Sequence, residues 1–269
     1  MQLTRWIQRL TQGLVVLALV LGAAAWAQAP APSIGVVVMH GKGGSPQKWV
    51  DGLANALTQA GYRVANLSMP WSRKRSYDVD VLATVEEVNR VFGHMREQGV
   101  QKVFIAGQSQ GGLFAAVYAG QARVDGLILL APGGMVDAQG FVRRLAPDRQ
   151  RAQDLMAQGR GDQIEDFNDF EGSKGLFARR TTGRIFWSWF DPNGLFTSAA
   201  FGRVRPETPT LFVAPTRDYP SLKSGKARWF AALPPHPLTR LYEPDADHMG
   251  VPSVAAPEVV RWIGEVASR

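Results

Sequence analysis

The chain has 269 residues, a formal net charge of +7 and no cysteine. The lack of cysteine excludes disulfide bonds and a reactive thiol, so core packing must hold the fold together. This length suits one large α/β domain, or a core domain with an inserted segment. The modest positive charge fits ordinary solubility, although it could also favour anionic substrates or a membrane surface.

The N-terminal segment is typical of a secretory signal peptide. Arg5 and Arg9 give it a basic start, an apolar run extends from Leu14 to about Ala25, and small residues precede a cleavage site after Ala27. A retained membrane anchor is the alternative, but the apolar run is shorter than the roughly 20 residues that a membrane span needs, which favours cleavage. We therefore expect a periplasmic or secreted protein that has lost residues 1–27.

Strand and helix patterns alternate along the rest of the chain, which indicates a mostly parallel sheet of about six strands flanked by helices. The predicted strands are Ser33–His40, Tyr62–Leu67, Lys102–Ala106, Gly126–Ala131, Thr210–Ala214 and Thr239–Tyr242. The predicted helices are Pro46 to Ala60 with Ser45 as its cap, Asp78–Gln98, Gly111–Gly120, Ser221–Ala232 and Ala256–Ala267. A long insert, residues 133–206, separates the fourth strand from the fifth.

One serine stands between glycines where the third strand should turn into a helix. Gly107, Ser109 and Gly111 form the pattern G-x-S-x-G in VFIAGQSQGGLFAA. Between a strand and a helix, this pattern predicts a sharp turn that lifts a nucleophilic hydroxyl above the carboxyl edge of the sheet. The alternative is a glycine-rich turn that contains an incidental serine.

A serine hydroxyl needs a base, and His248 is the histidine best placed to serve. It follows the last strand, and it should therefore lie at the same sheet edge as Ser109. By contrast, His94 falls within a helix, His236 lies in PPHP ahead of the last strand, and His40 ends the first strand. A solvent-facing loop histidine is the alternative for position 248.

The third member of such a site is a carboxylate that orients the histidine. Asp218 stands just beyond a buried strand, on the edge where His248 is expected. Asp245 and Asp247 compete because they are close to the histidine in sequence, but proximity along a loop does not aim a carboxylate at Nδ1. We rank Asp218 first, with a turn-capping aspartate as the alternative.

The loop HGKGGS, residues 40–45, is suited to bind a developing oxyanion because its glycines let the backbone approach the substrate closely. We expect the backbone N–H groups of Lys42 and Gln110 to be the donors. His40 and Gly41, in the same loop, are predicted to contact substrate. The loop lacks the spacing of nucleotide-binding glycine motifs, so we expect no nucleotide there.

Together, HGKGG, GQSQGG, Asp218 and DADH resemble the α/β-hydrolase superfamily, in particular its serine esterases and lipases. The resemblance covers nearly all of the expected mature chain except the insert. It implies an α/β-hydrolase fold that lacks the usual two leading strands, and a Ser109–His248–Asp218 triad. Gln108 departs from the residue that many members carry, and we expect this to matter little to the chemistry.

The resemblance also implies that the insert, residues 133–206, is a lid between the core segments 28–132 and 207–269. Its sequence is rich in arginine and aromatic residues. The stretch Ile185–Gly194 is the best candidate for roofing an acyl pocket, with Trp187 and Phe190 as substrate-binding residues. The alternative is that the aromatic rings seal the lid onto the core.

The histidines are isolated and cysteine is absent, so we expect no metal and no organic cofactor. The sequence predicts an exported serine hydrolase that cleaves small-molecule carboxylic esters, and no nucleic-acid partner. Thioesterase, amidase and acyltransferase activities use the same machinery and remain alternatives. A periplasmic binding protein of the same fold without turnover is the alternative from another class.

Overall fold

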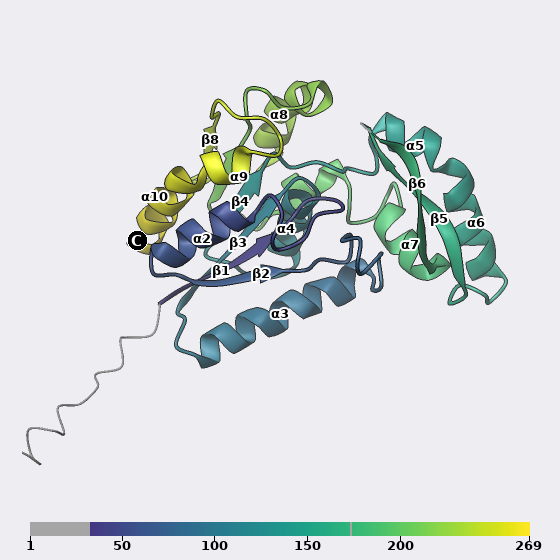
Figure 1. Cartoon of the computed structure of the whole chain (residues 1–269), viewed down its shortest axis with the longest axis horizontal. Helices are drawn as coiled ribbons and strands as arrows, with labels where there is room; N and C mark the ends of the chain where they lie inside the picture. The colour runs from purple at the N-terminus through teal and green to yellow at the C-terminus, as the bar shows by residue number, and fades with distance from the viewer. Residues whose placement is uncertain (1–32, 173) are drawn as a thin grey trace, which may run out of the picture. The chain divides into compact units, whose positions relative to one another are not determined.

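The computed structural model describes residues 33–172 and 174–269, so the predicted signal peptide lies outside the described residues. A six-stranded sheet has the order β2-β1-β3-β4-β7-β8, and a separate two-stranded sheet pairs β5 with β6 (Figure 1). The strands of the large sheet are β1 (Ile34–Met39), β2 (Arg63–Leu67), β3 (Lys102–Gln108), β4 (Gly126–Leu130), β7 (Thr210–Val213) and β8 (Arg240–Tyr242). All neighbours in this sheet pair in parallel, which confirms the predicted six-stranded parallel sheet.

The sheet is covered on both faces, as the unbroken apolar strands predicted. The side chains of Val37 and Ile105 belong to one buried cluster, whereas their neighbours Val36 and Ala106 belong to a second cluster on the other face. This alternation follows from the two-residue period of a strand. Each strand in the middle of the sheet therefore needs apolar residues at both odd and even positions.

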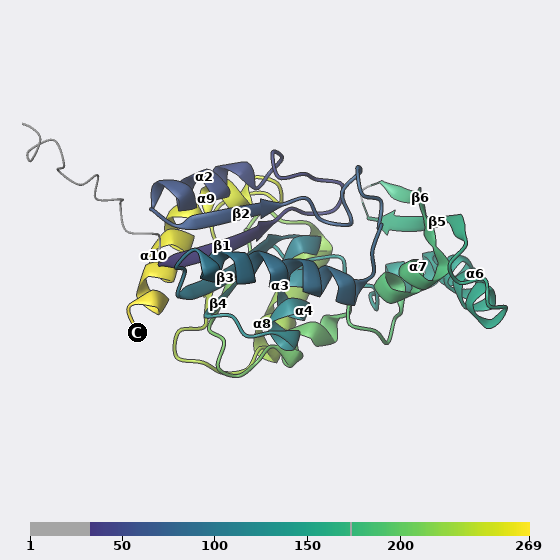
Figure 2. The same cartoon turned by 90° about the horizontal axis from the view of Figure 1, so that it is seen from below.

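Helices of the core lie on both sides of the sheet. They are α2 (Asp51–Gln59), α3 (Val81–Glu97), α4 (Gln110–Gln121), α8 (Pro220–Ala232), α9 (Val251–Val254) and α10 (Ala256–Ala267). Figure 2 shows α2, α9 and α10 on one side and α3, α4 and α8 on the other. Their order along the chain matches the predicted alternation.

The first helix begins at Asp51 and not at Pro46, so the predicted cap at Ser45 is wrong. Ser45 instead forms a bridge with Lys48 and Trp49, and the latter has a positive φ of 73° that a helix excludes. The residues between the first strand and the helix thus form a folded loop. This longer loop forms one wall of the site described below.

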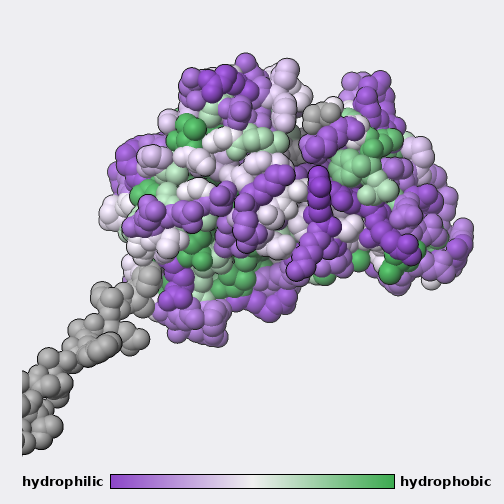
Figure 3. Space-filling model, in the orientation of Figure 1, coloured by the Kyte–Doolittle hydropathy of each residue, from purple (hydrophilic) through white to green (hydrophobic). Residues whose placement is uncertain are grey.

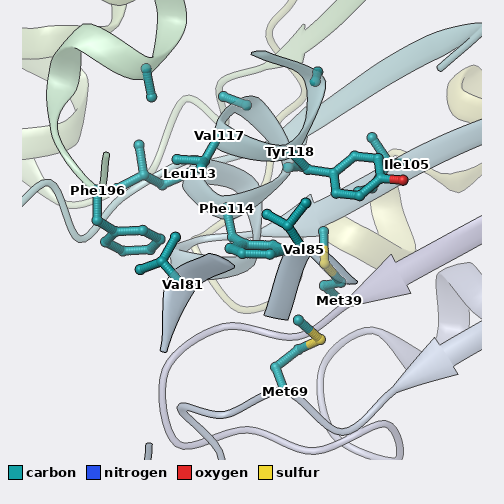
Figure 4. Packing of buried hydrophobic residues seen from close by; sticks show 14 of the residues in the cluster. Met39, Met69, Val81, Val85, Ile105, Leu113, Phe114, Val117, Tyr118 and Phe196 are labelled. Carbon is teal, nitrogen blue, oxygen red and sulfur yellow. The ribbon is translucent and has the colours of Figure 1, made fainter. Parts of the chain in front are cut away.

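The insert contains helices, a β-hairpin and a short 3-10 helix. Its elements are α5 (Gln139–Arg144), α6 (Ala146–Ala157), β5 (Ile164–Glu171), β6 (Gly175–Thr182), α7 (Gly183–Phe190) and η1 (Ser198–Arg203). Aromatic rings connect it to the core, since Trp189 and Phe196 both pack on Trp71 at centroid distances of 5.6 and 6.5 Å. Figure 4 shows Phe196 close to Phe114 and Leu113 of α4, within the same buried cluster.

The face of the molecule seen in Figure 3 is mostly hydrophilic, with smaller apolar areas between the charged residues. Among the residues that the structure describes, no helix is long and apolar enough to cross a membrane.

Candidate active site

Ser109 stands at a strained turn between β3 and α4. Its φ of 56° and ψ of −119° lie outside the regions that most side chains adopt. Strand and helix cross so tightly that a Cβ on Gly107 would lie 2.0 Å from the carbonyl oxygen of Gly111. Only glycine fits there, which explains the G-x-S-x-G spacing physically.

Backbone hydrogen bonds hold this turn. The N–H of Ser109 donates to Leu130 O at 2.9 Å, and its carbonyl oxygen accepts from the N–H groups of Gly112, Leu113 and Gly133. A Cβ on Gly133 would approach the Ser109 Oγ to 3.7 Å, so Oγ faces a residue without a side chain.

His248 lies on the loop after β8, next to Asp218 on the loop after β7. Nδ1 of His248 donates to Oδ1 of Asp218 at 2.7 Å, and the two side chains are only 6% and 5% exposed. The carboxylate also accepts from the N–H of Tyr219, whose ring lies 4.7 Å from the imidazole. With Nδ1 hydrogen-bonded to the carboxylate, Nε2 is the nitrogen left to act as a base.

The two competing aspartates are engaged elsewhere. Asp245 is exposed and pairs with Arg217, and Asp247 accepts from the backbone N–H groups of Met249 and Gly250. Asp247 thus fixes the turn that follows His248 without contacting the imidazole through a hydrogen bond.

A cavity of about 730 Å³ opens over this sheet edge and is lined by Ser109 and His248. Gly41, Lys42 and Gln110 line it too, whereas Asp218 lies behind His248. The apolar part of the wall comes from Trp49, Met135, Ala138, Phe141, Phe170, Leu222, Trp229 and Met249. The insert contributes Phe141 and Phe170, so both the core and the insert shape the cavity.

Two backbone donors, one in the loop after β1 and one at the start of α4, have no hydrogen-bond partner among the described residues. Gly43 N donates to Trp71 O and Gly44 N donates to Gly41 O, while the N–H groups of Lys42 and Gln110 make no hydrogen bond within the described part of the chain. The loop lies against the serine turn, because a Cβ on Gly41 would meet Ser109 Cβ at 3.0 Å. Both free donors thus belong to residues that line the cavity beside Ser109.

His40 does not line the cavity, which corrects the prediction that it contacts substrate. It is fully buried, its Nδ1 donates to Gly41 O at 2.7 Å, and its Nε2 accepts from Met69 N at 3.1 Å. Burial lowers the pKa of the imidazole, which keeps it neutral in this setting. His40 shapes the loop from beneath instead.

Trp187 and Phe190 do not line the cavity either, so their predicted role as substrate contacts needs correction. Phe190 stacks on Phe186 at 4.5 Å and packs on Tyr77 at 5.4 Å, and Trp187 packs against the same buried cluster. Both rings therefore pack against this cluster and not at the cavity. The insert rings at the cavity come from α5 and β5.

Gln108 has a larger part in the site than the sequence suggested. It is 1% exposed, and its Nε2 donates to the backbone oxygen of His248 at 3.1 Å. Gln108 thus links the serine turn to the histidine loop across 140 positions of sequence. Asp169 and Tyr77, which contact Lys42 and Gln110, were also missed, since no local pattern marks such distant partners.

The described residues contain no group of three or more His, Asp or Glu side chains that could hold a metal ion.

Comparison with known proteins bears on the fold. A family model described as the alpha/beta hydrolase fold matches residues 35–229. The chain resembles the solved structure of Est1E from Butyrivibrio proteoclasticus, with a TM-score of 0.63 and 15% identity, covering 90% of this chain and 91% of that one. No curated protein matches the chain at a significant level.

Two further solved structures are similar. A thermostable carboxyl esterase from Bacillus coagulans, solved with glycerol, has a TM-score of 0.64 and 16% identity, covering 88% of this chain and 91% of that one. A monoacylglycerol lipase from Paleococcus ferrophilus has a TM-score of 0.60 and 19% identity, covering 86% and 94%. At these identities the likeness concerns the fold.

Proposed function

This chain belongs to the α/β-hydrolase fold family, and we propose that it is a serine hydrolase that cleaves carboxylic esters through an acyl-enzyme. The observation that carries the proposal is the hydrogen bond from His248 to Asp218 at the edge of a cavity that Ser109 also lines. The strained backbone of Ser109 supports it, because such strain persists where function requires it.

In the proposed reaction, Ser109 Oγ attacks the ester carbonyl carbon while His248 Nε2 takes the hydroxyl proton. The carbonyl oxygen becomes an oxyanion, which the backbone N–H groups of Lys42 and Gln110 bind. Collapse breaks the bond to the alcohol, and the imidazolium returns its proton to that leaving group. Water then attacks the acyl-enzyme by the same route and releases the acid and free Ser109.

Asp218 has a positioning role in this reaction. It accepts the Nδ1 proton of His248, which fixes the tautomer and stabilises the imidazolium that forms during attack. Its burial strengthens this interaction, because water screens the carboxylate little.

The cavity supports small or medium esters with an apolar part. Its walls are mainly aromatic and aliphatic, and its volume of about 730 Å³ falls within the usual range for small-molecule sites. Three similar structures are described as carboxyl esterase, monoacylglycerol lipase and a ferulic acid complex of Est1E. Thioesters, amides and acyl transfer remain second candidates, because the same groups perform them.

A fluorophosphonate probe tests the proposal, because it reacts covalently with an activated serine. We expect labelling of the wild-type protein, and none of Ser109→Ala or His248→Ala. His94→Ala is the matched control and should be labelled like the wild type, since His94 is an exposed residue of α3. Folded wild-type protein that resists labelling would instead favour the non-catalytic binding protein.

A series of p-nitrophenyl esters of increasing acyl length then tests the substrate class. The proposal expects turnover of short and medium chains, and an amide or thioester series run in parallel ranks the second candidates. A better rate with thioesters than with matched esters would replace the ester assignment.

Export forms a separate part of the proposal, and it rests on the basic, apolar and small-residue segments before Ala27. Expression of the full chain in a Gram-negative host should yield periplasmic protein that begins at Gln28. N-terminal sequencing decides this, and an intact Met1 in the membrane fraction would favour the retained anchor.

A further inference from the structure

We propose that Asp169, on strand β5 of the insert, is a positioning residue that sets the two oxyanion donors. Its single carboxylate connects Lys42 directly and Gln110 through Tyr77. The inference rests on the proposed function, because it concerns the backbone donors of that same site. Under this proposal catalysis depends on the insert, although the insert supplies neither Ser109 nor its partners His248 and Asp218.

The first arm of this connection runs from Asp169 to Lys42. The Lys42 ammonium lies 2.5 Å from Asp169 Oδ1 and 3.0 Å from the carbonyl oxygen of Phe170, and its side chain is only 10% exposed. The ring centroid of Phe141 lies 5.1 Å from Nζ, with those of Phe177 and Phe190 within 6.0 Å. The side chain is therefore held inside the insert while the backbone N–H of the same residue lies at the cavity.

The second arm runs from Asp169 to Gln110. The Tyr77 hydroxyl donates to Asp169 Oδ2 at 3.0 Å and accepts from Gln110 Nε2 at 3.0 Å. Tyr77 and Asp169 are fully buried, and Gln110 is 3% exposed. Burial and the Asp169 charge raise the pKa of Tyr77 well above its ordinary value, so the hydroxyl keeps its proton for Asp169.

The hairpin β5–β6 also holds the backbone of Tyr77. Tyr77 has a positive φ of 56°, a strained conformation for an aromatic residue. Its carbonyl oxygen accepts from the Thr181 hydroxyl of β6 at 2.7 Å. Both strands of the hairpin β5–β6 therefore hold Tyr77, one through its hydroxyl and one through its backbone.

This arrangement can act on the oxyanion step because both ends of the network are donor residues. The Lys42 donor stands in a glycine-rich loop, and the Gln110 donor is the first residue of α4. Anchoring both side chains to one buried carboxylate limits how far the two N–H groups can separate. A misplacement of about 1 Å can cost about 100-fold in rate, so loss of the anchor should reduce turnover more than binding.

The main test compares Asp169→Asn with Asp166→Asn, which changes an exposed aspartate on the same strand. With a p-nitrophenyl ester, Asp169→Asn should lower kcat by about 10- to 100-fold with a KM within about threefold of wild type. Asp166→Asn should retain wild-type constants. Rates are measured well below the melting temperature of each variant, so that a purely stabilising role of Asp169 leaves them unchanged.

A second variant keeps the inference testable if Asp169→Asn fails to fold. Tyr77→Phe removes only the hydroxyl and preserves the ring packing, so it breaks the arm to Gln110 and leaves the Lys42 pair. It should lower kcat by about three- to tenfold. Where both variants fold, the double variant should lose no more than Asp169→Asn, because both changes interrupt one chain of contacts.

The inhibition constant of a transition-state analogue separates the two roles of Asp169, because it would not change if Asp169 only stabilised the fold. An aryl trifluoromethyl ketone adds Ser109 Oγ to its carbonyl carbon and forms a stable oxyanion. Its inhibition constant should rise in Asp169→Asn and Tyr77→Phe by the factor by which kcat/KM falls.

Wild-type kcat and inhibition constant in both folded variants would overturn the positioning role and leave the proposed function intact. Wild-type protein that neither turns over esters nor labels at Ser109 would overturn the proposed function, and the inference with it.

Discussion

The imidazole of His248 and the carboxylate of Asp218 meet at 2.7 Å although the residues stand 30 positions apart. Each follows a strand, β8 or β7, and these strands are neighbours in the parallel sheet. Their carboxyl ends therefore share one edge, which brings both loops together.

Asp218→Asn should lower kcat by about 10³- to 10⁴-fold, because the amide no longer fixes the productive tautomer of His248. The change is measured with a p-nitrophenyl ester under saturating conditions. Asp245→Asn is the control, since Asp245 is a neighbouring carboxylate with a 77% exposed side chain. Equal losses in the two variants would show that charge near the loop matters and that the hydrogen bond does not.

Gly107→Ala should destabilise the fold by roughly 3 kcal/mol, because its Cβ would lie 2.0 Å from Gly111 O. Chemical denaturation measures the free energy of unfolding. Gly93→Ala, within α3, is the matched control, since a Cβ there meets nothing within 4 Å. That variant should be about 0.5 to 1 kcal/mol more stable than the wild type, because alanine favours a helix. A stable Gly107→Ala protein would contradict the tight crossing of β3 and α4.

Burial of His40 should make the stability depend on pH. Burial lowers the pKa of His40 below its ordinary value of 6.5. At a pH between the folded and the unfolded pKa, the His40 imidazole is therefore protonated in the unfolded chain and neutral in the folded protein. The free energy of unfolding should therefore fall as the pH drops below about 6.5, until the lower folded pKa is reached.

Urea denaturation between about pH 7 and pH 5 measures this effect. His40→Asn should show a shallower fall than the wild type, because position 40 no longer titrates. The other histidines are the same in both proteins, so the difference between the slopes belongs to His40. Identical slopes would contradict the assignment.

Gln108→Met should lower kcat by about tenfold while KM changes little, because the side chain can no longer donate to the His248 carbonyl. Methionine has a similar volume, so the buried packing should persist. Gln101→Met, an exposed position ahead of the same strand, is the control. The comparison of kcat values at equal folded fraction decides the point, and equal values would assign Gln108 to packing alone.

The sequence predicted the elements of the core well because their signals are local. The unbroken apolar run of β1 marks a strand covered on both faces, and the apolar face of α3 repeats every 3.6 residues; neighbouring residues set both signals by themselves. The predicted start of α2 at Pro46 was wrong, because contacts of the preceding loop hold residues 45–50 outside the helix, which begins at Asp51. Asn66, for example, donates from Nδ2 to the carbonyl oxygen of Pro46, a contact that no helix signal reveals.

Part of the candidate site could also be predicted from local signals in the sequence. Gly107, Ser109 and Gly111 could be recognised because the strained turn demands those residues at that spacing. The position of Asp218 just beyond a buried strand, at the edge where His248 is expected, likewise made it a candidate for the carboxylate.

What the sequence alone determined is thus the order of strands and helices, the position of the strained serine and the sheet edge that carries its expected partners. Only the tertiary structure decided that His40 is buried beneath the loop and that the rings of α7 turn inward. It alone joins Lys42 to Asp169, 127 positions away. The reason is physical: backbone strain and periodicity act between neighbours along the chain, whereas the direction of a buried side chain depends on every element packed around it.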